Sequence, residues 1–232
     1  MQNDVSPPVS SGCYRYLLDG KDTGIDERWQ RQVSADGVVT TNSTRVAPGI
    51  KIAVRAQGTA SQINAFDVEW TREGAATLLA AYSFDGRDVL VSRSCAEQGM
   101  EQAVEQQRVV STQDVAPLLS PLMRIFAGPV IARLLADGGC GQVVLPFIGD
   151  PEARNQLLWP VLSERRAVRL PQADEILLVG SREIPARCCE YMGDQYADGT
   201  RFWLGSDDDL LRYCWQQPGV GEWDVRLEMD EG

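Results

Sequence analysis

Two opposite charges lie on an otherwise apolar strand face, and they are the residues of this sequence best placed to do chemistry. In segment 25–33, residues 26, 28, 30 and 32 are all polar, so the other face is predicted to point inward. That inward face carries Glu27, Trp29 and Arg31. A charge in an apolar lining must be paired or hydrated. Glu27 and Arg31 are therefore predicted to orient a ligand head group, with Arg31 suited to a phosphate or carboxylate. The alternatives are a structural ion pair to a neighbouring strand and a hydrated charge at the mouth of a barrel.

Most enzymatic chemistry is disfavoured by what the chain lacks. It contains no histidine, which removes histidine-dependent triads, imidazole proton shuttles and imidazole metal sites. It has no nucleophile elbow, P-loop or dinucleotide fingerprint. Its six cysteines include no C-x-x-C pair, so they are expected to be buried free thiols. The sequence predicts no catalytic residue, no metal and no cofactor. A carboxylate-using hydrolase or isomerase acting in the same hollow is kept as an alternative.

Composition and charge restrict the partners. The chain has 232 residues, 44% of them hydrophobic, and a net charge of −11, which argues against binding to nucleic acid or anionic membranes. The apolar stretch 115–136 is interrupted by Arg124, Arg133 and prolines, so it is not predicted to span a membrane. The first twelve residues lack a secretory signal pattern. A cytoplasmic protein is therefore expected, with a periplasmic one as the alternative.

Strand patterns dominate both ends of the chain. Runs of alternating residues separated by Asp-Gly and similar turn signals are typical of an antiparallel meander. In the first half they span 13–18, 25–33, 38–46, 50–60, 63–72, 76–84 and 88–93. In the second half they span 141–148, 164–170, 175–179, 184–192, 200–204, 210–216 and 222–229. A sheet of about a dozen strands does not stay flat, because strand twist makes it curl.

The segment between the halves has a different character. Asp114, Ser120-Pro121 and Gly128-Pro129 are helix-start signals, so two or three short helices are predicted within residues 112–140. Another brief helix is predicted from Asp150-Pro151. The apolar side chains of the 112–140 segment must be covered, and the dry face of the sheet is the available partner. Leu122, Met123 and Phe126 are the best candidates for a movable lid, because methionine and leucine repack easily.

Together these patterns predict an α+β, mainly β fold: a curved antiparallel sheet that forms a half-closed barrel with a short-helix plug. A disordered segment is expected at 1–12, followed by one domain at 13–232. Within that domain, residues 13–110 supply the first strand set, 111–140 the plug and 141–232 the second strand set. The large aromatics expected near the hollow are Trp29, Trp70, Tyr82, Phe84, Trp203, Tyr213 and Trp215.

Several segments carry a family resemblance, namely Tyr14–Gly20, Ala81–Gly86, Val144–Phe147, Arg201–Leu204 and Leu210–Tyr213. They resemble uncharacterised bacterial proteins related to the LolA/LolB-type lipoprotein carriers, whose fold is a half-closed antiparallel barrel lidded by short helices. The resemblance implies a ligand-holding role for lipid or acyl chains in the bacterial envelope. It supplies no catalytic motif, and this sequence lacks the export signal of such carriers.

The sequence therefore predicts non-catalytic binding of a hydrophobic, lipid-like or acylated ligand on the concave face of the sheet. The partner would be a lipid-like small molecule or an acylated protein. A structural or interaction domain with a filled core is the remaining alternative.

Overall fold

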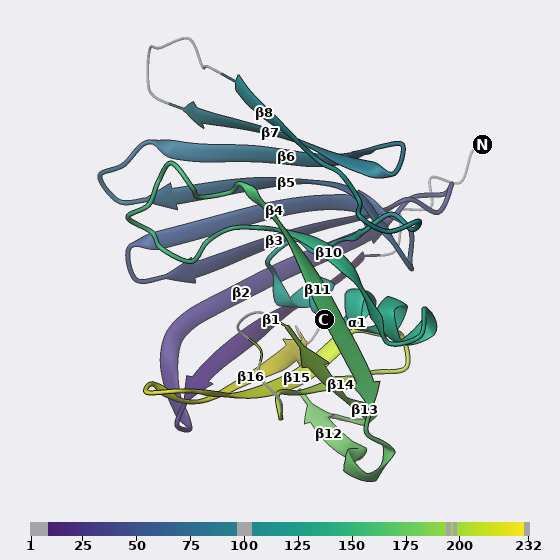
Figure 1. The fold of residues 1–232 in the computed structure, drawn as a ribbon. Helices are drawn as coiled ribbons and strands as arrows, with labels where there is room; N and C mark the ends of the chain where they lie inside the picture. The colour runs from purple at the N-terminus through teal and green to yellow at the C-terminus, as the bar shows by residue number, and fades with distance from the viewer. Residues whose placement is uncertain (1–8, 97–103, 194–195, 197–198, 230–232) are drawn as a thin grey trace, which may run out of the picture.

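The structure, a computed structural model, describes residues 9–96, 104–193, 196 and 199–229. Its strands form one large curved sheet that remains open (Figure 1). The first strand set comprises β1 (Val9–Leu18), β2 (Lys21–Val33), β3 (Val39–Ala47), β4 (Ile50–Gly58), β5 (Ile63–Arg72), β6 (Thr77–Asp85), β7 (Asp88–Ala96) and β8 (Val104–Val109). The second comprises β9 (Leu118–Leu119), β10 (Cys140–Pro146), β11 (Pro160–Arg169), β12 (Glu175–Val179), β13 (Arg182–Met192), β14 (Arg201–Leu204), β15 (Leu210–Gln217) and β16 (Gly221–Met229).

The strand order confirms the predicted fold class. From edge to edge the sheet runs β8-β7-β6-β5-β4-β3-β2-β1-β16-β15-β14-β13-β11-β10-β9, and β12 pairs with β13 outside this path. Strands β1 to β8 form a continuous antiparallel meander, because tight turns such as those at Gly20 and Gly86 supply the positive φ that reverses the chain. The first and last strands pair with each other in the middle of the sheet.

The concave face receives the plug. A single 3₁₀ turn, η1 (Arg124–Phe126), continues directly into the helix α1 (Ala127–Ala136). The helix packs against β11 and β10 (Figure 1). The short strand β9, which precedes η1 in the sequence, contacts β5. Ile125, Ile131 and Leu134 are almost fully buried there. Gly128 lies so close to the β14–β15 turn that a Cβ would approach the Asp208 carbonyl oxygen to 2.0 Å. The helical insert therefore fills part of the interior, as predicted.

Some local predictions were wrong. Residues 9–12 belong to β1 instead of being disordered, while the rest of that predicted segment, 1–8, lies outside the described residues. No helix begins at Asp114, because Leu118-Leu119 pairs in parallel with Val143-Val144 and the chain there is extended. The segment after Asp150 forms turns and no helix. Asp150 does accept the Glu152 N–H at 2.9 Å, but the chain then turns to bury Leu157 and Leu158.

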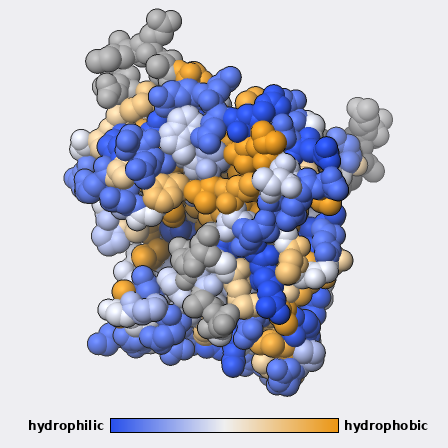
Figure 2. Space-filling view, in the orientation of Figure 1, coloured by the Kyte–Doolittle hydropathy of each residue, from blue (hydrophilic) through white to orange (hydrophobic). Residues whose placement is uncertain are grey.

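Apolar side chains are exposed to solvent in two areas of the surface. Figure 2 shows apolar side chains gathered where β10 and β11 meet the first strand set, and again over β12, where Ile176 and Leu178 are 65% and 72% exposed. Among the described residues, no helix has the length and apolar character needed to cross a bilayer.

Candidate functional site

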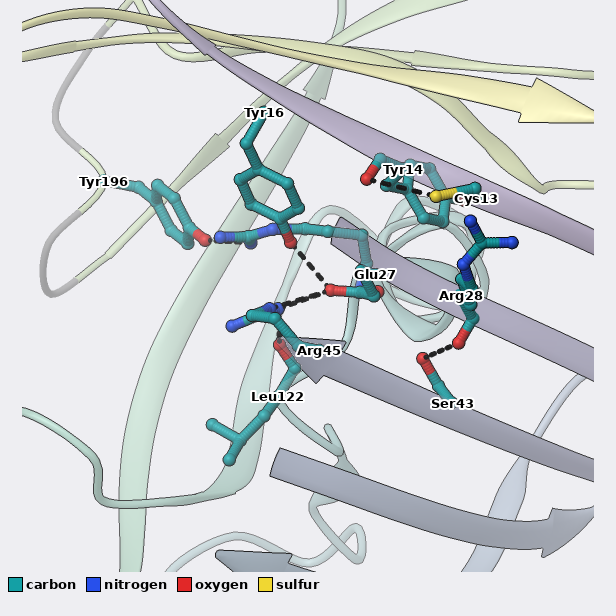
Figure 3. Close-up of polar contacts among 10 residues, drawn as sticks. Cys13, Tyr14, Tyr16, Glu27, Arg28, Ser43, Arg45, Leu122 and Tyr196 are labelled. Carbon is teal, nitrogen blue, oxygen red and sulfur yellow. Dashed lines mark hydrogen bonds and ion pairs between the residues drawn. The ribbon is translucent and has the colours of Figure 1, made fainter. Parts of the chain in front are cut away.

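A fully buried carboxylate forms the centre of a polar network beneath the plug (Figure 3). Glu27 on β2 is 0% exposed, and its Oε2 accepts a hydrogen bond from Tyr16 Oη at 2.7 Å. Arg45, on the neighbouring strand β3, donates to the same oxygen from Nη2 at 2.6 Å and from Nε at 3.0 Å. The Glu27 charge is therefore paired, as its burial requires. This geometry matches the structural ion pair that the sequence left open as an alternative.

The same network fastens the plug to the sheet. Glu27 Oε1 accepts the backbone N–H of Arg124, the first residue of η1. Arg45 Nη2 also donates to the Leu122 carbonyl oxygen at 3.0 Å. With four donors around its two oxygens, Glu27 is arranged to position the chain, and this arrangement does not favour a role in acid–base chemistry.

Next to this pair, the Arg124 guanidinium lies among aromatic rings. Its central carbon is 4.5 Å from the ring centroid of Tyr213 and 6.0 Å from that of Tyr16. Nη1 donates to Tyr196 Oη at 2.7 Å, and the buried Nε has no hydrogen-bond partner. Within the part of the chain that the structure describes, no carboxylate forms an ion pair with this guanidinium.

These groups border a cavity of about 420 Å³ between the plug and strands β10, β11 and β13. This is within the usual volume range of small-molecule pockets. Arg45, Arg124 and Arg165 line it, and no acidic residue does so among the described residues. The Arg165 guanidinium lies 5.5 Å from the Tyr191 ring centroid. The rest of the lining is mainly apolar or aromatic and consists of Ser120, Leu122, Met123, Ala127, Leu145, Pro146, Phe147, Ile148, Gly149, Val161, Tyr191, Tyr196 and Phe202.

The buried phenols stay neutral beside these cations. Burial raises the pKa of Tyr16 well above its ordinary value, although Arg45 opposes this shift. Burial likewise raises the pKa of Tyr213 to about 12, although the adjacent Arg124 favours the phenolate. The site thus presents neutral hydroxyls and permanently charged guanidiniums, which are hydrogen-bond donors suited to an anion.

The second predicted charge, Arg31, is also paired within the chain. Its Nη2 lies 2.7 Å from Oδ1 of Asp209 and its Nη1 lies 3.2 Å from Oδ2. Burial raises the pKa of Asp209, and the hydrogen bond from Arg31 opposes this shift. The pair borders a separate, smaller hollow of about 230 Å³ that Phe126 also lines. The structure therefore does not bring Arg31 and Glu27 together at one hollow.

The predicted aromatic and lid residues are distributed over several places. Leu122 and Met123 line the cavity. Trp29, Trp70, Tyr82 and Tyr213 are buried, whereas Phe84 and Trp215 are only half-buried. Trp215 lies beside the cavity residue Tyr196, with their ring centroids 5.8 Å apart.

Trp203 lies away from the predicted hollow. Phe202 occupies the inner position on β14, so alternation directs Trp203 to the other face of the sheet. There its Nε1 donates to the Ala173 carbonyl oxygen at 3.2 Å, in the 3₁₀ turn η2 (Pro171–Ala173). The same alternation directs Cys188 and Cys189 to opposite faces of β13, and both are buried free thiols.

Sequence analysis missed the cavity residues Arg45, Arg124 and Arg165. Segments 38–46 and 164–170 carry polar residues on both alternating faces, so neither face can be identified as inward. In the sequence, Arg124 is recognisable only as an interruption of an apolar stretch. A charge inside a stretch that must be buried was the available signal.

Comparison of the chain with models of known protein families, with curated proteins and with solved structures found no match. The resemblance to the LolA/LolB-type carriers therefore stays a prediction.

Proposed function

We propose that this protein binds, without catalysis, a hydrophobic or lipid-like ligand whose apolar part occupies the cavity beside the plug. The observation that carries the proposal is the cavity of about 420 Å³, lined by aliphatic and aromatic side chains. Transfer of an acyl chain into such a lining contributes roughly 0.8 kcal/mol per CH₂ before the costs of association.

The plug supports a gating role. Leu122 and Met123 line the cavity and belong to the irregular segment that leads into η1. Their backbone N–H groups donate within this segment, to Ser120 and Pro121, and not to a strand of the sheet. Flexible apolar side chains adapt to ligands of different shape. The contacts of Glu27 and Arg45 with this segment give it a defined closed position. Ligand entry would require these side chains to repack.

The direct test is to extract the purified protein with organic solvent, analyse the extract by mass spectrometry and titrate the protein with a fluorescent fatty acid and an acylated peptide. We expect saturable uptake of at least one probe. Retention of the acylated peptide alone would identify an acylated protein as the partner. Absence of bound lipid together with absence of saturable uptake would overturn the proposal.

A cavity-filling variant locates the site. Val161 lines the cavity, so Val161→Trp should fill part of it and weaken probe binding by about tenfold or more, which corresponds to 1.4 kcal/mol. The matched control is Val46→Trp, since Val46 is 50% exposed and lies outside the cavity lining. Equal affinities of the two variants would contradict binding in this cavity.

A further inference from the structure

Resting on this proposed function, we propose that the ligand is an amphiphile with an anionic head group and that Arg124 binds that head group. The ligand class is thereby narrowed to an acyl chain that ends in a carboxylate or phosphate. The proposal depends on the charge and hydrogen-bond state of the side chains around the cavity.

Arg124 has donor capacity that its surroundings do not use. Its guanidinium lines the cavity and carries five N–H donors. Among the described residues, Tyr196 Oη is the one acceptor that these donors bond. Stacking on Tyr213 at 4.5 Å favours the cation but supplies no acceptor for its N–H groups. A guanidinium in such a site binds a carboxylate or phosphate through charge-assisted hydrogen bonds.

The carboxylate near Arg124 forms its ion pair with another arginine. Arg45 is matched by Glu27, whose oxygens are occupied by Tyr16, Arg45 and the Arg124 backbone. Arg165 also lines the cavity, but its guanidinium is engaged elsewhere, since Nη1 donates to the Gly193 carbonyl oxygen. No described lining residue is acidic. Among the described residues, the Arg124 guanidinium therefore gives the lining a positive charge that no ion pair matches, in a chain whose net charge is −11. Such a local reversal of sign attracts an anion into the cavity.

The apolar part of the lining determines how an amphiphile would be oriented in the cavity. Arg124 lies at the plug side of the cavity, whereas Leu145, Phe147, Ile148 and Val161 come from β10, β11 and the chain that follows β10. A head group at Arg124 places the acyl chain toward these residues. A free inorganic anion would use the arginines and leave this apolar lining without a ligand.

The test is isothermal titration of the full chain with dodecanoate, dodecanol, dodecyl phosphate and inorganic phosphate. We expect at least one dodecyl anion to bind tenfold or more tightly than dodecanol. In Arg124→Gln this preference should vanish, while the affinity for dodecanol stays unchanged. The control Arg28→Gln removes an exposed arginine outside the lining and should behave as the original protein.

The outcomes separate the two proposals. If neither dodecanol nor the dodecyl anions bind, the proposed function fails and this inference fails with it. If dodecanol and both anions bind equally, or if the preference for the anions survives in Arg124→Gln, the proposal that Arg124 binds an anionic head group is overturned. The proposed binding of a hydrophobic ligand then still stands. If inorganic phosphate binds as tightly as dodecyl phosphate, the cavity is a site for free anions, and the proposal that the ligand is an amphiphile is overturned. A folded Arg124→Lys variant, checked by circular dichroism, should retain part of the preference because it keeps the charge.

Discussion

Arginines stack on aromatic rings in two regions of this molecule, and the two regions use them differently. Beside β7, the Arg93 guanidinium lies 5.4 Å from the Trp159 ring centroid and Arg154 lies 5.6 Å from that of Trp70. Arg93 donates to the carbonyl oxygens of Leu157 at 2.9 Å and Arg154 at 2.6 Å. These bonds fasten the turn segment 150–158 onto the first strand set.

The cavity region contains both uses of arginine side by side. Arg45 fastens the plug through Glu27 and Leu122, as Arg93 fastens the turn segment. Arg124 is stacked in the same way but has few acceptors for its N–H groups and borders open volume. The comparison teaches that stacking holds a guanidinium in place, while its acceptors decide whether it serves stability or remains available for a ligand.

The largest effect is expected from removing the charge that fastens the plug. Glu27→Gln leaves Arg45 buried without its counter-charge, which should lower the free energy of unfolding by about 3–5 kcal/mol. Urea unfolding measures this loss. The control is Asp26→Asn, whose partner Arg15 is 39% exposed, and it should cost about 1 kcal/mol or less. Similar losses in the two variants would show that the buried network does not fasten the plug.

A smaller loss is expected in the region without the cavity. Arg93→Gln leaves the Leu157 and Arg154 carbonyl oxygens without these donors and should destabilise the fold by about 1–3 kcal/mol. Dodecanoate affinity, measured by calorimetry, should not change. The comparison breaks down if Arg93→Gln weakens binding, or if Arg124→Gln destabilises the fold as much as Arg93→Gln does.

Alkaline titration distinguishes the two regions further. Burial raises the pKa of Tyr213 to about 12 and also raises that of Tyr82, whose hydroxyl donates to the Leu158 carbonyl oxygen. Because an unfolded tyrosine ionises near pH 10, these phenols contribute stability that is present below about pH 10 and is lost as the pH rises through their folded pKa. Tyr213→Phe should lessen the loss between pH 10 and about 12.

The charge of Arg124 should affect the pKa of one of these phenols, Tyr213. Its charge favours the Tyr213 phenolate, so Arg124→Gln should move Tyr213 ionisation to higher pH, as followed by ultraviolet absorbance. Arg28→Gln serves as the control and should leave the titration unchanged. An unchanged Tyr213 titration in Arg124→Gln would contradict the stacked geometry of the cavity region.

The smallest effect is expected in thiol reactivity. Cys189 is buried on the inner face of β13, opposite Phe202, whereas Cys95 lies on β7 in the other region. Cys189 does not line the cavity, but it lies on the same face of β13 as the cavity residue Tyr191 and borders α1. Because a bound ligand stabilises the closed structure around it, dodecanoate should slow the labelling of Cys189 and leave that of Cys95 unchanged, as followed by mass spectrometry of peptides. Cys140, which is exposed, should react first with or without ligand. Equal slowing at Cys95 would place the ligand elsewhere.

The sequence predicted the sheet well because its signals are local. Alternation identifies the inner face of a strand such as β5, whose predicted and observed bounds agree at Ile63–Arg72. Asp-Gly, Pro-Gly and Glu-Gly turns together separate most neighbouring strands of the first half. The β9 pairing was missed, because two residues are too few for a periodic pattern and their partner lies far along the chain.

The site was less predictable, because distant segments build it. Glu27 and the Arg124 backbone are 97 residues apart in sequence, and the cavity also needs β11 and β13. Alternation correctly placed Glu27 inside but could not show that Arg45 neutralises it. Nor could it show that Arg124, inside an apolar stretch, borders open space. Long arginine side chains reach their partners from many backbone positions, so sequence spacing constrains them weakly.

The pairing of β1 with β16 has a consequence for how the chain reaches its native state. Gly12 lies opposite Met229 and Leu18 opposite Trp223, so one side of β1 pairs with a strand that lies far along the sequence (Figure 1). Strands β1 to β7 can form as successive hairpins, but the contact that unites the two halves of the sheet requires β16. Such long-range closure is entropically costly and slows folding. A circular permutant in which a short linker connects the end of β16 to the start of β1 would make this contact local and should fold faster.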